Sequence, residues 1–202
     1  DRVYKGQSLP SMVSKEYFDL YQEMGLNFFT ATLPDSDSKV DEFLSLCDEY
    51  NMGAFITFGD LYNRIEENAN VTVKTVEDNL DKFSSHKSLL GFNLRDEPTK
   101  NMIDALKKTT DSLKESKYAT SMHAYGNALP EYAGATYYWD GGAAKWHVYL
   151  DYYCEQLNLG YLSYDYYPWM IKEDGSEYYK AGYIKSLSTA RKVANKYRVP
   201  LW

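Results

Sequence analysis

Six apolar segments recur along the chain, and each follows an amphipathic stretch that ends in a glycine or a short polar turn. A helical period followed by a short apolar run, repeated in this way, predicts parallel strands joined by helices. The predicted strands are Leu26 to Leu33, Gly53 to Phe58, Gly91 to Glu97, Tyr118 to Tyr125, Tyr161 to Tyr167 and Val199 to Trp202. The repeat therefore predicts an α/β protein of the (β/α)8 TIM-barrel type.

The length of the chain limits how much of such a barrel it can form. With 202 residues, 44% of them hydrophobic, the chain can bury one core, so residues 1–202 are predicted to form a single domain. A barrel of this type usually takes about 250 residues. We interpret Val3-Tyr4-Lys5-Gly6 as a remnant of the first strand, which makes Gly91 to Glu97 strand four and Val199 to Trp202 strand seven. We therefore expect an incomplete barrel, with the missing segment supplied by a longer native chain or by a partner.

Charge and composition exclude several classes of function. The net charge is -7, and the lysines and arginines are interspersed with acids, which argues against a nucleic-acid partner. No run of about 18 apolar residues is present, so no membrane span is predicted. No signal peptide opens the chain, although removal of a leader would be compatible with a secreted or cell-surface protein. Cys47 and Cys154 fall on separate predicted helices, which favours neither a disulfide nor a metal site, and no cofactor is predicted.

The predicted loops after strands are longer than the turns after helices. In an α/β barrel the loops after strands line the catalytic face. Here they include Gly59 to Thr75, Gly126 to Lys145 and Pro168 to Glu177, and they carry Trp139 and Trp169 among several of the 21 tyrosines. Aromatic rings with polar tips suit both packing and sugar binding. Long decorated loops on one face favour a functional site there.

The strongest candidate for chemistry is the end of the strand Gly91 to Glu97. The segment turns from apolar to charged at Arg95-Asp96-Glu97, and Pro98 ends the strand because it cannot donate to a sheet. Acids at the carboxyl end of a barrel strand are typical of catalytic or ligand-binding residues. Alternatively, Glu97 forms a structural ion pair with Arg95.

Glu97-Pro98 at the end of the fourth strand resembles the retaining glycoside hydrolases of the large (β/α)8 clan, whose general acid/base glutamate closes strand four, usually within Asn-Glu-Pro. The resemblance implies an oligosaccharide or polysaccharide substrate and the acid/base role for Glu97. It also implies a nucleophile at the end of strand seven, which would lie beyond residue 202. Asp96 stands where the clan has an asparagine that donates to the sugar 2-hydroxyl, and an ionised Asp can only accept.

Other residues at predicted strand ends complete the candidate site. Asp165 closes the strand Tyr161 to Tyr167 and is the only other acid in a comparable position. Together with Tyr166, Tyr167 and Trp169 it would form a sugar platform. His123 and Tyr125 are predicted on one face near the carboxyl end of the fifth strand, and Asp60 follows the third. An alternative for His123 is a satisfied core histidine.

Two other functions fit the same residues. The first is a metal-dependent sugar isomerase that uses Glu97, His123 and Asp165 as ligands, since hard cations favour carboxylates with a histidine. The second is a barrel that binds glycans through its aromatic cleft without turning them over.

Overall fold

The computed structural model describes residues 3–4, 7–8, 13–33, 36–59, 61–62, 71–131 and 145–202. These residues form two compact units. The first unit holds the described residues up to 62 together with 71–94 and 112–125. The second unit holds 95–111, 126–131 and 145–202.

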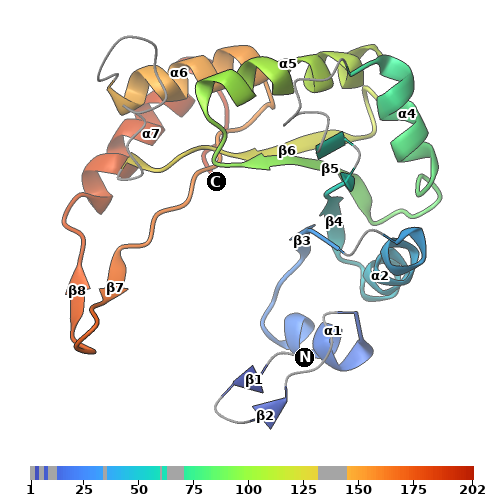
Figure 1. The fold of residues 1–202 in the computed structure, drawn as a ribbon, viewed down its shortest axis with the longest axis horizontal. Helices are drawn as coiled ribbons and strands as arrows, with labels where there is room; N and C mark the ends of the chain where they lie inside the picture. The colour runs from blue at the N-terminus through green and yellow to red at the C-terminus, as the bar shows by residue number, and fades with distance from the viewer. Residues whose placement is uncertain are drawn as a thin grey trace. The chain divides into compact units, whose positions relative to one another are not determined.

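Helices and strands alternate through most of the described chain (Figure 1). The helices are α1 (Lys15–Glu23), α2 (Asp37–Tyr50), α4 (Val73–Asp81), α5 (Lys100–Glu115), α6 (Trp146–Leu157) and α7 (Tyr183–Tyr197). The strands are β1 (Val3–Tyr4), β2 (Gln7–Ser8), β3 (Phe28–Ala31), β4 (Gly53–Ile56), β5 (Leu89–Asp96), β6 (His123–Asn127), β7 (Trp169–Ile171) and β8 (Glu177–Tyr179).

The main sheet has the strand order β3-β4-β5-β6, and its strands are parallel. Phe28 pairs with Gly53, and Ala54 pairs with Leu89. Helices α2, α4 and α5 each connect one strand to the next. This alternation confirms the predicted α/β class with a parallel sheet. In the part of the chain that the structure describes, the sheet has four strands and does not close into a barrel.

Two further segments of the second unit join the parallel arrangement through single bridges. Tyr164 pairs with Ala128, directly after β6, and Leu201 pairs with Leu162. The Ala128 N–H donates to the carbonyl oxygen of Ser163 at 2.8 Å. The last two predicted strands are therefore parallel neighbours, although they form isolated bridges and no regular strand.

Two antiparallel hairpins were not predicted. β1 pairs with β2, with Val3 opposite Ser8, so Val3-Tyr4 is not a remnant of a parallel first strand and that prediction is wrong. β7 pairs with β8, with Trp169 opposite Tyr179, in a stretch predicted as a strand-to-helix loop. Figure 1 shows this second hairpin extending away from α6 and α7 of the same unit. Hydrophobic periodicity does not predict short hairpins of this kind, because each strand contributes only two or three residues.

β6 begins later than the sequence predicts. Residues 116–122 form turns after α5, and the Met122 N–H donates to the carbonyl oxygen of Tyr118 at 3.0 Å. Because this bond holds the backbone in a helical turn, the strand starts only at His123 and ends at Asn127. His123 therefore lies at the amino-terminal end of its strand, and the prediction that placed it near the carboxyl end is wrong.

Gly91 allows β5 and β6 to approach each other closely. Its φ is +146°, and a Cβ atom at this position would lie 1.7 Å from the carbonyl oxygen of His123. No other residue fits such a contact without moving the backbone. This glycine is thus a requirement of the sheet, whereas the sequence pattern marks it only as the start of a strand.

Individual residues at the ends of the helices determine where these helices begin and end. The Ser14 side chain accepts a hydrogen bond from the Tyr17 N–H at 3.3 Å and so caps the start of α1. Asn51 and Asn158, with φ of 55° and 47°, are the left-handed caps of α2 and α6. Asparagine tolerates this conformation better than most residues that carry a side chain.

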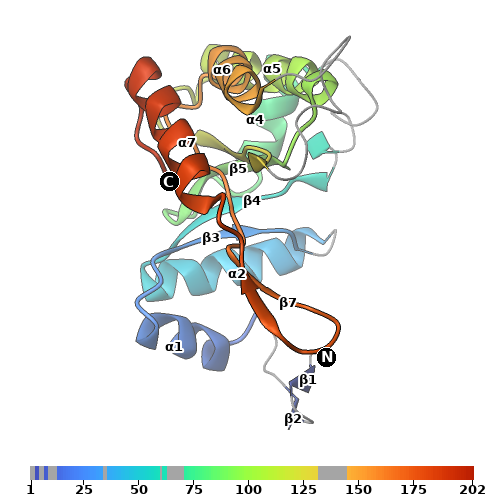
Figure 2. The ribbon, with the colours of Figure 1, turned by 90° about the vertical axis from the view of Figure 1, so that its left-hand side faces the viewer.

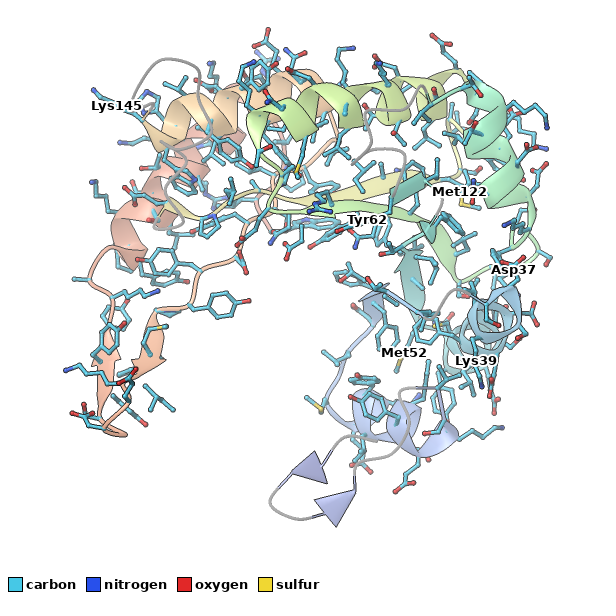
Figure 3. The ribbon with its side chains drawn as sticks, viewed as in Figure 1. Asp37, Lys39, Met52, Tyr62, Met122 and Lys145 are labelled. Atoms are coloured by element: carbon cyan, nitrogen blue, oxygen red, sulfur yellow. The ribbon has the colours of Figure 1, made fainter. Side chains whose placement is uncertain are left out.

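In the first unit, α1 and α2 lie together beside β3 (Figure 2). The ring of Phe18 on α1 is fully buried, and its centroid lies 5.3 Å from that of Phe29 on β3 and 5.7 Å from that of Phe43 on α2. Asp37 and Lys39, at the start of α2, are exposed (Figure 3). The amphipathic pattern of α2 thus turns its aromatic face toward the sheet and its charges toward solvent.

The second unit is built around α6 and α7. Tyr149 and Tyr153 of α6 are 0% and 1% exposed, which accounts for two of the tyrosines as packing residues. Cys154 of this unit and Cys47 of the first unit are both buried and free. Burial raises the pKa of each thiol to about 12. None of the described helices combines the length and the apolar character needed to cross a membrane.

Candidate functional site

Glu97 follows the last residue of β5 in a conformation that is rare for a residue with a side chain. Its φ is 50°, in the left-handed region. Its N–H donates to the carbonyl oxygen of Asn127 at 2.9 Å. The carbonyl oxygen of the following residue, Pro98, accepts from the Tyr149 hydroxyl at 2.9 Å. The backbone on both sides of the Glu97 side chain is therefore held by hydrogen bonds. Strained backbone of this kind concentrates at functional sites.

The Glu97 carboxyl group is half-buried and lies next to two other acids. Burial raises its pKa, and the charges of Asp165 and Asp96 and a side-chain hydrogen bond with Asp165 raise it further. Two ionised carboxylates cannot hydrogen-bond, so this contact needs a proton on one of them. Burial and both charges favour that proton on Glu97.

Asp165 has an incompletely satisfied carboxylate. Its Oδ1 is buried and has no hydrogen-bond partner among the described residues. A buried acceptor without a donor is costly. The Glu97 carboxyl beside it has a raised pKa, so it binds a proton more readily than an isolated glutamate does.

A second set of polar contacts connects the ends of β5 and β6 with the segment around Ser163. The Asn127 Nδ2 donates to Asp96 Oδ1 at 3.1 Å, and the Ser163 hydroxyl donates to Asn127 Oδ1 at 2.9 Å. Asp96 is exposed, Asn127 is half-buried and Ser163 is buried. The chain of contacts thus runs from the interior of the second unit to a carboxylate at its surface.

Tyrosine hydroxyl groups form hydrogen bonds with the backbone near the ends of β5 and β6. The Tyr149 hydroxyl accepts from the Leu129 N–H at 3.0 Å while donating to Pro98, and burial raises the pKa of this phenol. The Tyr161 hydroxyl accepts from the Gly126 N–H at 2.9 Å. The two hydroxyls therefore hold the backbone at Gly126, directly before Asn127, and at Leu129, two residues after it.

A separate cavity of about 680 Å³ opens beside α7 in the same unit. It is lined by Tyr164, Tyr166, Tyr183, Ile184, Leu187, Ser188, Arg191, Leu201 and Trp202. Its volume and aromatic lining are typical of small-ligand sites. Glu97 and Asp165 do not line it.

The structure distributes the remaining predicted site residues widely. His123 is exposed, and the ring of Tyr125 lies 5.3 Å from that of Phe55 within the first unit. Arg95 is half-buried on β5. Asp60 and Trp139 lie outside the described residues.

The predicted sugar platform is only partly assembled. Tyr166 lines the cavity, and its ring centroid lies 5.3 Å from that of Tyr183. Tyr167 is 59% exposed, and Trp169, on β7, is 67% exposed and contacts Tyr179 across the hairpin. Of the predicted site residues, the structure brings together Glu97, Asp96 and Asp165, all in the second unit.

Sequence reasoning missed Asn127, Ser163 and Tyr149. Asn127 carried a usable signal, because it is a polar residue that closely follows the predicted strand Tyr118 to Tyr125. Ser163 lies inside a predicted strand and Tyr149 lies on a helix, so nothing local distinguishes either of them from packing residues.

In the described part of the chain, no three His, Cys, Asp or Glu side chains are grouped so that they could hold a metal ion. No protein-family model matches the chain, and no curated protein matches it closely enough to count as a relative.

Proposed function

We propose that this chain carries the acid/base part of a glycoside hydrolase active site, with Glu97 as the group that protonates the departing glycosidic oxygen. The observation that carries the proposal is the contact between Glu97 and Asp165 at the ends of parallel segments, with Asp96 adjacent. A general acid works best when its pKa lies near the working pH, and burial with two neighbouring negative charges raises the pKa of Glu97 in that direction. The carboxyl end of parallel strands is where α/β barrels place their catalytic residues.

The chemistry assigned to Glu97 is proton transfer in both directions. As the carboxylate nucleophile expected beyond residue 202 bonds to the anomeric carbon, the bond between that carbon and the glycosidic oxygen breaks, the Glu97 proton moves to this oxygen, and the leaving group departs as an alcohol. In a retaining mechanism the Glu97 carboxylate then takes a proton from the attacking water, which restores the acid.

Asp165 is assigned as the partner that keeps Glu97 protonated. The two carboxyl groups of a retaining enzyme lie about 5–5.5 Å apart, and those of an inverting enzyme about 6.5–9.5 Å. Hydrogen-bonded oxygens lie about 2.5–3 Å apart. A direct hydrogen bond between Glu97 and Asp165 is shorter than either spacing, so we assign Asp165 to holding the Glu97 proton rather than to attack on the anomeric carbon.

The test is the hydrolysis of two series of glycosides by a polypeptide that joins this chain to the expected nucleophile, as the parent and as Glu97→Gln. With alkyl leaving groups the variant should lose about 10²- to 10⁴-fold in kcat/KM, since glutamine cannot transfer a proton. With a dinitrophenyl leaving group, which departs without protonation, the loss should be much smaller. Glu155→Gln, an exposed glutamate on α6, is the matched control. Equal losses for both leaving groups, or no loss, would contradict the role of Glu97.

A second candidate, glycan binding without turnover, is favoured by the aromatic cavity beside α7. Trp202 is 53% exposed and lines this cavity, and its ring is stacked on that of Tyr161 with centroids 4.5 Å apart. Neutral oligosaccharides, tested by calorimetry, should bind Trp202→Ala about three- to tenfold more weakly than the parent. Trp169→Ala, on the hairpin, should bind like the parent. Binding that both variants retain would exclude the cavity as the site.

A further inference from the structure

Asn127 contacts both acidic residues at the end of β5, each through a different group. Its backbone carbonyl accepts from the Glu97 N–H at 2.9 Å, and its side-chain Nδ2 donates to Asp96 Oδ1 at 3.1 Å. One residue at the end of β6 therefore holds the backbone of the first acid and the side chain of the second.

The orientation of the Asn127 amide follows from its two neighbours. Ser163 provides a hydroxyl that donates to Oδ1 at 2.9 Å, and Asp96 provides an acceptor for Nδ2. The opposite orientation would place Oδ1 against a carboxylate oxygen, with no proton between them. Ser163 is buried, so the serine fixes the amide from the interior.

Asp96 is exposed, so a hydrogen bond such as the one from Asn127 is needed to hold its carboxylate in place. An exposed carboxylate gains conformational freedom and hydration by pointing into water, and its effect on a neighbouring group is then screened. The donation from Asn127 opposes that movement. We propose that Asn127 is a positioning residue, which holds the Asp96 carboxylate beside Glu97 and fixes the Glu97 backbone. This inference rests on the proposed acid role of Glu97 and extends it to a residue that does not itself react.

The inference predicts that loss of the Asn127 side chain acts on Glu97 through Asp96. The readout is the titration of the Glu97 carboxyl by NMR, in protein labelled with ¹³C at the glutamate carboxyls. The Glu97 signal is identified as the one missing from Glu97→Gln. In Asn127→Ala the backbone carbonyl remains but Asp96 is released, so the Glu97 midpoint should move to lower pH. Asp96→Asn should shift it in the same direction.

The double variant Asp96→Asn/Asn127→Ala tests whether Asn127 acts on Glu97 through Asp96. Its Glu97 midpoint should equal that of Asp96→Asn alone, because Asn127 then has no carboxylate to hold. Ser163→Ala should give a smaller shift in the same direction, and it serves as the second variant should Asn127→Ala not fold. Asn195→Ala, an exposed asparagine on α7, should leave the midpoint unchanged.

Two results would overturn the inference. The first is a Glu97 midpoint in Asn127→Ala and Ser163→Ala that equals the parent value while Asp96→Asn lowers it. The second is a double variant whose shift is the sum of the two single shifts. The titration needs no substrate, so its outcome is distinguishable from a failure of Glu97→Gln to slow the hydrolysis of alkyl glycosides, which would overturn the proposed function alone.

Discussion

At the scale of single residues, the properties of Glu97 come from its neighbours more than from its position in the sequence. Burial and the charges of Asp165 and Asp96 all act in the same direction on its pKa. The left-handed backbone at Glu97 costs of order 1–3 kcal/mol. The hydrogen bond from its N–H to Asn127 helps to offset that cost.

Asp165→Asn should lower the pKa of Glu97. The substitution removes the negative charge that raises the Glu97 pKa most, and the new amide can donate to an ionised Glu97, so both changes favour the charged form. A smaller fraction of Glu97 then holds its proton at neutral pH. The basic limb of the kcat/KM profile against pH should move to lower pH, and the NMR titration should move with it. Asp174→Asn in the hairpin turn is the control, and a basic limb that coincides with that of the parent would refute the pairing.

At the scale of elements, the turn between α4 and β5 is held to α2 by one histidine. His86 Nδ1 lies 2.8 Å from Asp48 Oδ2, and Nε2 lies 3.1 Å from Asp41 Oδ1. Asp48 Oδ1 also accepts from the Ser88 N–H at 2.8 Å. Burial lowers the pKa of His86, but the hydrogen bonds and charges of Asp41 and Asp48 outweigh it, so the pKa is raised. A protonated ring, which donates from both nitrogens, suits this contact.

The His86 contact predicts a pH dependence of stability. A raised pKa in the folded state stabilises the fold fully below the unfolded value of about 6.5, and this contribution is lost as pH rises through the folded pKa. His86→Gln, which cannot be charged, should therefore lower the unfolding temperature more at pH 5.5 than at pH 8.5. His147→Gln, an exposed histidine on α6, should show no such difference. A deficit that is the same at both pH values would show that the contact does not depend on charge.

Asp48 sets the lower boundary of that pH range. Burial raises its pKa, but hydrogen bonds from His86 and Ser88 together with the His86 charge lower it overall. A lowered carboxyl pKa contributes stability that is lost as pH falls below the unfolded value of about 3.9. The contact between the turn and α2 is thus strongest between about pH 4 and 6.5.

At the scale of the whole molecule, the proposed chemistry belongs to one of the two compact units. Glu97, Asp165 and Asn127 all lie in the second unit, where the ends of β5 and β6 and the bridge at Tyr164 are successive parallel neighbours. The net charge of -7 is compatible with a neutral substrate and unfavourable for polyanions such as nucleic acids. The alternation of helices and parallel strands is what collects these residues at one edge.

The sequence by itself determined the parallel α/β class and the position of Glu97 after a strand. Both depend on local information, since hydrophobic periodicity separates helices from strands and Pro98 ends β5. Local patterns did not determine where β6 begins, because turn bonds at Met122 compete with the sheet. They also did not reveal the short hairpins.

Only the tertiary structure decided which residues surround Glu97. Asp96 and Asn127 are 31 residues apart, and Asn127 and Ser163 are 36 apart, so their contacts depend on the register of separate strands. Register is set by packing and by glycines such as Gly91, which bring two backbones together in a way that no local period encodes. An acid at a strand end could therefore be read from the sequence, whereas the partners that raise its pKa required the folded chain.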